Sequence, residues 1–238
     1  MLGIVIPAHN ESLLIADALA AVMAAARHPG LDGEAVEVAV VLDSCTDTTG
    51  VLAARAGART VSVNARNVGV ARAVGAEAML AVGARWLAFT DADTVVSPSW
   101  LVDQLAQEAD AVCGSIGVDD WSAHGHQAAE LLAHFKRTYH DVDGHRHIHG
   151  ANLGVSAEAY RRAGGFRHLA CSEDVALVQA LEATGARIAW SAKPRVVTSA
   201  RRDARAKGGF ADALLGALAN SLAVVAPPGA ALAPRNGA

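Results

Sequence analysis

Short apolar runs alternate with amphipathic stretches along the first half of the sequence, and this alternation constrains the fold more than any other feature. The periodicity predicts strands over residues 2–7, 36–42, 60–63 and 86–90, separated by helices over 12–27, 46–56 and 69–82. Repeated strand and helix units of this length require crossover connections, which join parallel strands. The sequence therefore predicts an α/β fold, in which a Rossmann-like, doubly wound, mostly parallel sheet is covered by helices on both faces.

The composition is that of a folded globular protein. A chain of 238 residues that is 52% hydrophobic and only 18% charged can bury a large core, which favours a single domain. We expect it to consist of two abutting halves, residues 1–115 and 116–225, followed by a loose tail over 226–238. The formal net charge of −4 gives no electrostatic basis for nucleic-acid binding, which needs a concentrated basic face.

The cysteines and the first residues predict a cytoplasmic protein. Cys45, Cys113 and Cys171 are odd in number and far apart, which fits neither a disulfide framework nor a zinc site. Residues 1–7 lack the basic region and the length of a signal peptide, and no stretch is long enough for a transmembrane helix. The apolar residues 210–225 leave three alternatives open: core packing, a homodimer interface, or peripheral contact with a membrane.

The second half of the sequence combines shorter elements with a polar, histidine-dense stretch. Helices are expected over residues 123–139, 158–163 and 172–184, and a strand over 152–156. Ser172 is a favourable N-cap for the last of these helices. Residues 140–150 are too polar for the core, so we interpret them as an active-site loop.

Two aspartates one residue apart, Asp91 and Asp93, follow the apolar run that ends at Thr90. Side chains at positions i and i+2 of an extended segment share a face, so the two carboxylates would form a hard oxygen site for a divalent cation. Open α/β sheets bind ligands beyond the carboxyl ends of their strands, where this pair falls. The alternative is that Asp93 starts a turn with Thr94 and caps the helix that Pro98 would open.

Polar residues also follow the other three strands of the first half. They are His9, Asn10 and Glu11 after the first strand, Asp43 and Asp47 after the second, and Arg66 and Asn67 after the third. With the aspartate pair they place four polar loops on one rim of the predicted sheet. Such a rim makes a cleft for a polar ligand.

Several short segments occur together in a characteristic order. They are Ile6-Pro7-Ala8-His9-Asn10-Glu11, Val41-Leu42-Asp43-Ser44-Cys45-Thr46-Asp47-Thr48-Thr49, Arg66-Asn67-Val68-Gly69-Val70-Ala71-Arg72, Asp91-Ala92-Asp93, Gly150-Ala151-Asn152 and Glu173-Asp174. The set resembles the motifs of the nucleotide-sugar-dependent glycosyltransferases of family 2, which have the GT-A fold. A series of motifs in order is far more specific than any one of them.

The resemblance implies a donor site for a UDP- or GDP-sugar. The nucleotide-sugar-binding residues that it implies are Pro7, Ala8, Glu11, Asp43, Arg72, Asp91 and Ala92. Asp43 would bind the edge of the base, and Arg72 the base or the phosphates. Asp93 would hold a divalent cation, Mn²⁺ or Mg²⁺, with Asp91 on the ribose or on the metal through water. Such a cation neutralises the charge that develops on a leaving diphosphate.

The resemblance also implies an acceptor site and an inverting transfer of a hexose to a hydroxyl group. Gly150, Ala151 and Asn152 would form the acceptor side, and the acceptor is a small molecule, a lipid or a glycan. Asp174 is the expected general base and Glu173 the second choice. Adjacent residues at a helix start diverge, so only one of these two carboxylates can face the acceptor.

Histidines and arginines of the second half leave alternatives open. His145, His147 and His149 alternate, so they would point the same way if extended and could bind Zn²⁺; we favour acceptor binding, particularly by His149, or a mobile loop. Arg201 and Arg202 have a guanidinium fork that suits a diphosphate, and a solvated surface position is the alternative.

The motifs depart from the family pattern at Leu42, at Ser44-Cys45 and at Ala73. The sequence has no Gln-x-x-Arg-Trp motif, which argues against a processive polysaccharide synthase. A nucleotidyltransferase of related fold is one alternative, but it usually carries a glycine-rich basic loop after the first strand. A catalytically degenerate nucleotide-binding module is the other, and the intact Asp91, Asp93 and Asp174 argue against it.

Overall fold

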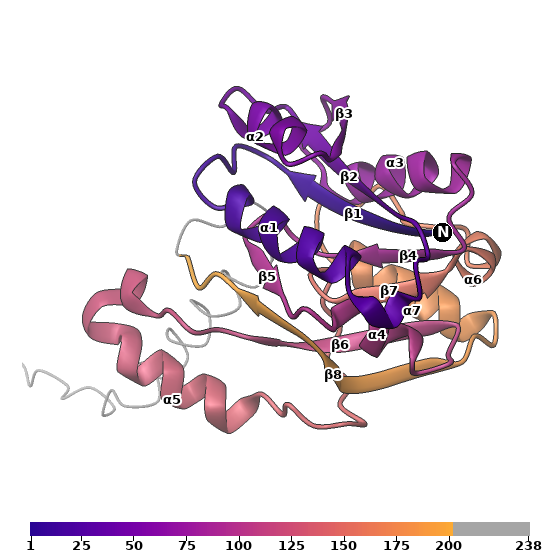
Figure 1. Ribbon diagram of the computed structural model, residues 1–238. Coiled ribbons are helices and arrows are strands. Elements are labelled where there is room, and N and C mark those ends of the chain that lie inside the picture. The colour runs from indigo at the N-terminus through magenta and orange to yellow at the C-terminus, as the bar shows by residue number, and fades with distance from the viewer. Residues whose placement is uncertain (202–238) are drawn as a thin grey trace, which may run out of the picture.

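The computed structural model describes residues 1–201, which form one eight-stranded sheet with helices on both faces (Figure 1). The strands are β1 (Leu2–Ala8), β2 (Val36–Asp43), β3 (Arg59–Val63), β4 (Trp86–Phe89), β5 (Thr94–Val96), β6 (Ala111–Gly117), β7 (Leu153–Ser156) and β8 (Ile188–Thr198). The α-helices are α1 (Ile15–Ala26), α2 (Thr49–Arg55), α3 (Val68–Ala81), α4 (Trp100–Leu105), α5 (Ala128–Thr138), α6 (Ala157–Arg162) and α7 (Glu173–Ala183), and the 3₁₀ helices are η1 (Pro29–Leu31) and η2 (Ser122–Gln127).

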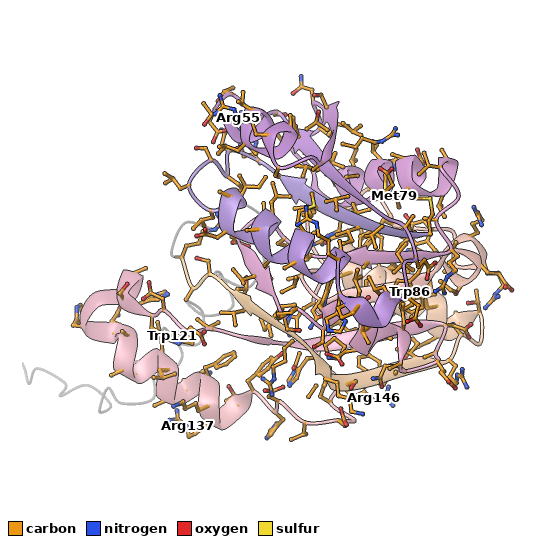
Figure 2. All side chains as sticks on the ribbon, viewed as in Figure 1. Arg55, Met79, Trp86, Trp121, Arg137 and Arg146 are labelled. Carbon is orange, nitrogen blue, oxygen red and sulfur yellow. The ribbon has the colours of Figure 1, made fainter. Side chains whose placement is uncertain are left out.

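The first half of the chain forms the parallel part of the sheet, in the order β3-β2-β1-β4. Alternate residues of β1 serve two apolar layers: Ile4 packs with α1, α2 and α4, whereas Val5 packs with α3, α6 and α7. Trp86 and Met79, both labelled in Figure 2, belong to these two layers respectively. The predicted α/β fold with helices on both faces is confirmed.

The second half of the sheet is mixed. The antiparallel strand β7 lies between β4 and β6, and β8 pairs with β6 in parallel and with β5 in the antiparallel direction. Strand β8 has eleven residues and was not among the expected strands. Neither β5 nor β6 was expected, because β5 has only three residues and β6 carries glycines that interrupt its apolar pattern.

Two local expectations about helix starts need correction. The helix expected over residues 123–139 begins at Ala128, because Gly125 has φ 54° and ψ −126° and separates η2 from α5. Ser172 precedes α7 as expected but does not cap it through its side chain: its φ is 57°, in the left-handed region, and its side chain makes no capping hydrogen bond.

Some expectations lie outside residues 1–201, namely the apolar helix over 210–225, the tail over 226–238 and the position of Arg202. Within the described part, no helix has the length and apolar character that crossing a bilayer requires. The expected boundary between halves at residues 115 and 116 falls within β6, a strand of the common sheet. The division into halves stays a prediction.

Candidate active site

The polar loops after β1 and β2 meet at the carboxyl edge of the parallel strands, as predicted. The Asn10 side chain accepts a hydrogen bond from the backbone amide of Thr46 at 2.8 Å, and the Glu11 amide donates to the Thr49 hydroxyl at 2.8 Å. Helices α1 and α2 each begin three residues later than expected. The cause is that residues of each loop bond to the other loop before the helix starts. The Pro7 and Ala8 positions, at the end of β1, form the base of this edge.

Asp43, the last residue of β2, is buried and organises the loop that follows β3. Its two carboxylate oxygens accept hydrogen bonds at 2.7–3.0 Å from the hydroxyl of Ser44 and from the backbone amides of Ala65, Arg66 and Asn67. Burial acts to raise the pKa of Asp43, but the amide bonds outweigh it and keep the pKa below its ordinary value. Three of these bonds end on Oδ1 and one on Oδ2, so Oδ2 keeps an open acceptor position. The expected contact between Asp43 and a base stays a prediction.

The guanidinium of Arg72 is buried between carboxylates from distant parts of the chain. Its Nη1 pairs with Oε1 of Glu173, and its Nη2 pairs with Oδ1 of Asp91 at 2.6 Å. Gly150 lies against the same guanidinium so closely that a Cβ at this position would overlap it. Arg72 on α3 therefore joins the aspartate pair after β4 to the acidic pair at the start of α7. Its expected contact with a base or phosphate stays a prediction.

Asp93 and Glu11 both form ion pairs with the guanidinium of Arg201. The guanidinium of Arg201 pairs with Oε2 of Glu11 at 2.7 Å and with Oδ2 of Asp93 at 3.0 Å, and the Arg201 side chain is 25% exposed. Burial raises the pKa of Asp93 to about 6, against the opposing effect of the Arg201 charge. The carboxylate of Asp91 adds to the negative potential at Arg201. Arg201 is thus ion-paired beside the aspartate pair and partly exposed, and its expected contact with a diphosphate stays a prediction.

The donor set around Asp93 fits a hard divalent cation that shares its ligands with a substrate. Carboxylate oxygens are the ligands that Mg²⁺ and Mn²⁺ prefer. Among residues 1–201, however, no three His, Cys, Asp or Glu side chains are grouped so as to hold a metal by themselves. A cation at Asp93 would therefore need further oxygens from a diphosphate and water. Ala92, between the two aspartates, is buried in the apolar layer of α1.

The two acidic residues at the start of α7 diverge, as expected. Glu173 is buried against Arg72, whereas Asp174 is only partly buried. The Asp174 Oδ2 atom accepts a hydrogen bond from the Gly150 amide at 2.7 Å, and its Oδ1 accepts from the Val175 amide at 2.8 Å. These two bonds orient the carboxylate, and each oxygen keeps a second lone pair that can accept a proton.

The segment Gly150-Ala151-Asn152 contributes its backbone to this site. The Asn152 side chain is buried: its Oδ1 accepts from Trp100 Nε1 at 2.9 Å, and its Nδ2 donates to the carbonyls of Ser115 and Pro194 at 2.7 and 2.8 Å. Ala151 is buried as well. Gly150 is also buried, and its amide donates to Asp174. The acceptor role of these residues stays a prediction.

The three alternating histidines do not converge on a metal. One ring nitrogen of each accepts a hydrogen bond: His147 Nε2 from the His140 amide, His145 Nδ1 from the His147 amide, and His149 Nε2 from the Tyr139 hydroxyl. Their rings stack on one another and on Tyr139, with centroids 4.1 Å apart for Tyr139 and His147. Burial, and then the neighbouring His147 and His145, lower the pKa of His149 to about 4. The three rings act as stacking groups in this arrangement.

Two aspartates that the sequence did not single out anchor the histidine-dense loop. Asp141 accepts from the Ser115 hydroxyl and pairs with Arg195, both at 2.5 Å. Asp143 accepts from the Ser191 hydroxyl at 2.8 Å and the Ala192 amide at 2.9 Å. The loop is therefore bonded to β6 and β8. No signal in the sequence distinguishes these aspartates from solvated loop residues.

The mixed sheet, the polar carboxyl edge and the two acidic pairs define the GT-A class of glycosyltransferase domains. The chain belongs to glycosyl transferase family 2: the model of that family matches residues 3–164. No curated protein matches the sequence. The resemblance inferred from the short motifs is thereby confirmed.

Solved structures of similar fold are enzymes of this class. They include Staphylococcus aureus TarS 1–349 in complex with UDP-GlcNAc (15% identity, TM-score 0.63), covering 93% of this chain and 66% of that one. Glucosyl-3-phosphoglycerate synthase from Mycobacterium tuberculosis, in complex with Mn²⁺ and UDP-glucose, has 19% identity and a TM-score of 0.55 over 94% of this chain and 76% of that one. The mannosyltransferase PcManGT from Pyrobaculum calidifontis, in complex with GDP-Man and Mn²⁺, has 19% identity and a TM-score of 0.57 over 88% and 58%. The chain thus spans less than two thirds of the TarS 1–349 and PcManGT chains.

Proposed function

We propose that the protein transfers a hexose from a nucleoside diphosphate sugar to a hydroxyl acceptor, with inversion and with a divalent cation. The observation that carries this proposal is the ion-paired connection from Asp91 through Arg72 to Glu173. It brings the aspartate pair of the donor side and the acidic pair of the acceptor side into one site. A nucleotide-binding module without catalysis would need the first of these pairs and have no use for the second.

On the donor side, the loops after β1 and β2 bind the nucleotide. Pro7, Ala8 and Glu11 contact the ribose and base, and Asp91 contacts the ribose. The base is uracil or guanine, a choice supported by the UDP- and GDP-sugars of the similar structures. Asp43 contacts the edge of the base through its Oδ2 atom, which accepts only one hydrogen bond from the protein.

Asp93 holds Mn²⁺ or Mg²⁺, with the remaining oxygens supplied by the diphosphate and water. Such a cation stabilises the negative charge of the leaving nucleoside diphosphate. Arg201 contributes a second positive charge to the diphosphate, since it lies beside Asp93. Arg202 is proposed for the same role, outside the described residues.

On the acceptor side, Asp174 is the general base. Its carboxylate accepts the proton of the acceptor hydroxyl as that oxygen bonds to the anomeric carbon. The bond from this carbon to the diphosphate oxygen breaks on the opposite face, and its electron pair leaves with the diphosphate, so the configuration inverts. The amides of Gly150 and Val175 orient Asp174 for this attack. Glu173 is buried against Arg72, so it holds the arginine in place and does not transfer a proton.

The acceptor is a small molecule, a lipid or a glycan, and His149 and the backbone of Gly150 line its site. We propose a cytoplasmic enzyme that acts alone or as a homodimer, with peripheral membrane contact as the setting if the acceptor is a lipid. These assignments follow from the sequence expectations, and an acceptor screen distinguishes among the three classes of acceptor.

Calorimetric titration tests the donor assignment. UDP, GDP and their sugar derivatives are titrated into the protein with and without Mn²⁺. We expect one nucleotide to bind in a Mn²⁺-dependent manner, and Asp93→Ala to weaken that binding about 10- to 100-fold, as when supporting groups of a metal site are lost. Asp17→Ala, an exposed aspartate on α1, is the control and leaves binding unchanged. Failure of every nucleotide to bind contradicts the proposal.

A kinetic test addresses Asp174. With a reactive acceptor, Asp174→Asn is expected to lower kcat by about 10²- to 10⁴-fold, the usual contribution of a general base, while the affinity for the donor is retained. Unchanged turnover in this variant would remove Asp174 from the mechanism.

A further inference from the structure

Arg201 lies where the proposed function needs a metal cation. Its guanidinium reaches Glu11 and Asp93 together, and both carboxylates are largely buried. Arg201 occupies Oδ2 of Asp93, and a second cation on the same carboxylate would be repelled by its positive charge. A metal that binds Asp93 must therefore compete with Arg201.

The position of Arg201 is fixed by the strand pair that precedes it. Thr198, near the end of β8, is opposite Thr94 at the start of β5, and their hydroxyls are 2.9 Å apart. Thr94 directly follows Asp93. The register of β5 and β8 therefore brings the residues after Thr198 to the aspartate pair.

The residue before Arg201 is fixed independently by the second half of the chain. Ala200 is buried in an apolar cluster with Val118, Trp121 and Leu131, against which Phe135 of α5 packs. Figure 2 shows Trp121 beside the start of the η2 and α5 segment. Insertion of Ala200 into this cluster leaves its neighbour Arg201 beside Asp93.

One polar group inside this cluster holds the Ala200 backbone. His124 in η2 is 1% exposed, and its Nε2 lies 2.6 Å from the Ala200 carbonyl, to which it donates. The other ring nitrogen, Nδ1, has no hydrogen-bond partner among the described residues. Burial of a histidine in an apolar cluster lowers the stability of the fold unless the ring makes a strong hydrogen bond. Here that bond is made to the carbonyl of Ala200, the residue before Arg201.

We propose that Arg201 is a built-in counter-ion of Asp93 and Glu11, positioned by His124, which a divalent cation displaces from Asp93 when the donor binds. The inference rests on the proposed function for the location of the metal. In the unliganded protein Arg201 balances the carboxylates. When metal and diphosphate bind, the Arg201 guanidinium leaves Asp93 and binds the phosphate oxygens of the donor. Two such oxygens match the two parallel N–H groups of the guanidinium. His124 is a positioning residue, because it acts through the backbone of Ala200.

This arrangement predicts effects of opposite sign on two ligands. Arg201→Gln removes the competitor, so the affinity for free Mn²⁺ should rise by about 3- to 10-fold, the range of a moderately strong ion pair. The same change removes a phosphate contact, so the affinity for the nucleoside diphosphate in saturating Mn²⁺ should fall. His124→Phe retains a ring in the apolar cluster but loses the donor, and it should shift Mn²⁺ affinity in the same direction by a smaller factor. A general structural defect would weaken both ligands.

The test is titration of Mn²⁺ alone, followed by electron paramagnetic resonance, and then titration of UDP and GDP at saturating Mn²⁺. Arg162→Gln, which removes an exposed guanidinium paired with Glu158 on α6, controls for net charge. His126→Phe controls for His124, since His126 is exposed in the same 3₁₀ helix. Arg201→Lys, which keeps the charge, should leave the Mn²⁺ affinity near that of the unmodified protein.

The outcomes separate this inference from the proposed function. If Mn²⁺ binds, Asp93→Ala abolishes that binding and Arg201→Gln leaves it unchanged or weaker, the counter-ion role is overturned while the metal site stands. If His124→Phe behaves like the unmodified protein although Arg201→Gln binds Mn²⁺ more tightly, the positioning role of His124 is overturned. If no nucleotide and no Mn²⁺ binds any form, the proposed function itself fails.

Discussion

At the scale of single residues, Arg72 determines how the two acidic pairs relate to each other. The guanidinium is 4% exposed, its two carboxylate partners lie on different elements, and Glu173 is 101 residues away along the chain. It also lies over the ring of Phe166, 5.9 Å from the centroid. An ion pair at this depth is costly to form and still more costly to break, since removal of one partner leaves a buried uncompensated charge.

We predict that Arg72→Met lowers the free energy of unfolding by about 3–5 kcal/mol, because Glu173 then remains charged and buried. Chemical denaturation monitored by circular dichroism measures the loss. The double variant Arg72→Met with Glu173→Gln should regain part of it, since the uncompensated charge is gone. Equal destabilisation in the single and double variants would show that packing of the arginine, rather than its charge, matters.

Residue roles were also where the sequence was least informative. The motifs located Asp43, Arg72 and Asn152 correctly in the fold, but the atoms that each side chain contacts depend on segments far away in the chain. The partners of Asp43 are amides after β3, and those of Asn152 are carbonyls within β8 and β6. A backbone amide or carbonyl has no sequence signature, so such partners appear only once the chain is folded.

At the scale of elements, the start of α7 departs from local sequence rules. Ser172 has the residue type of an N-cap but adopts a left-handed conformation, and Glu173 and Asp174 then turn to opposite sides. Ser156 before α6 does act as a cap, accepting a hydrogen bond from the Ala159 amide at 3.2 Å. The difference arises from tertiary contacts of the acidic pair, which outweigh the capping preference.

This contrast predicts that substitutions of the two serines change the free energy of unfolding in opposite directions. Ser172→Gly should stabilise the protein by up to about 1 kcal/mol, because glycine adopts a positive φ without the steric cost that a Cβ brings. Ser156→Ala should instead destabilise it by about 1 kcal/mol through loss of a cap. Thermal and denaturant unfolding of both variants measures the two effects. If Ser172→Gly were destabilising, Ser172 would contribute interactions that its conformation does not reveal.

Elements with a strong local period were predictable, and those without one were not. The strands β1 to β4 and the helices between them follow from apolar spacing, with ends that shift where loops bond across the cleft. The three residues of β5 are too few for a period, and their strand conformation depends on pairing with β8, which comes 100 residues later. The helix break at Gly125 likewise depends on how η2 packs.

At the scale of the whole molecule, the response to acid depends on the stacked loop after α5. The pKa of His149 lies at about 4 instead of the ordinary 6.5, so the folded state binds fewer protons than the unfolded state between these values. The stability that neutral His149 provides is therefore complete above pH 6.5 and is lost as the pH falls toward 4. Asp93, whose pKa is raised, acts in the opposite direction.

A comparison of variants isolates the histidine. His149→Gln keeps an acceptor for the Tyr139 hydroxyl but does not titrate, so its unfolding free energy should fall less between pH 6.5 and 4 than that of the unmodified protein. His140→Gln, at an exposed position, serves as the control. Parallel curves for the unmodified protein and His149→Gln would contradict the assignment of His149 as a buried neutral group.

The buried connection through Arg72 also has a consequence for recombination between members of the family. A crossover within β6 would transfer Gly150 and Glu173 from one parent while Arg72 and Asp91 came from the other. Such a chimera keeps these ion pairs only if one parent supplies the arginine and the aspartate and the other supplies the glutamate and the glycine that leaves room for the guanidinium. The segment after β6 is thus not a free module: its exchange depends on one arginine in the segment before it.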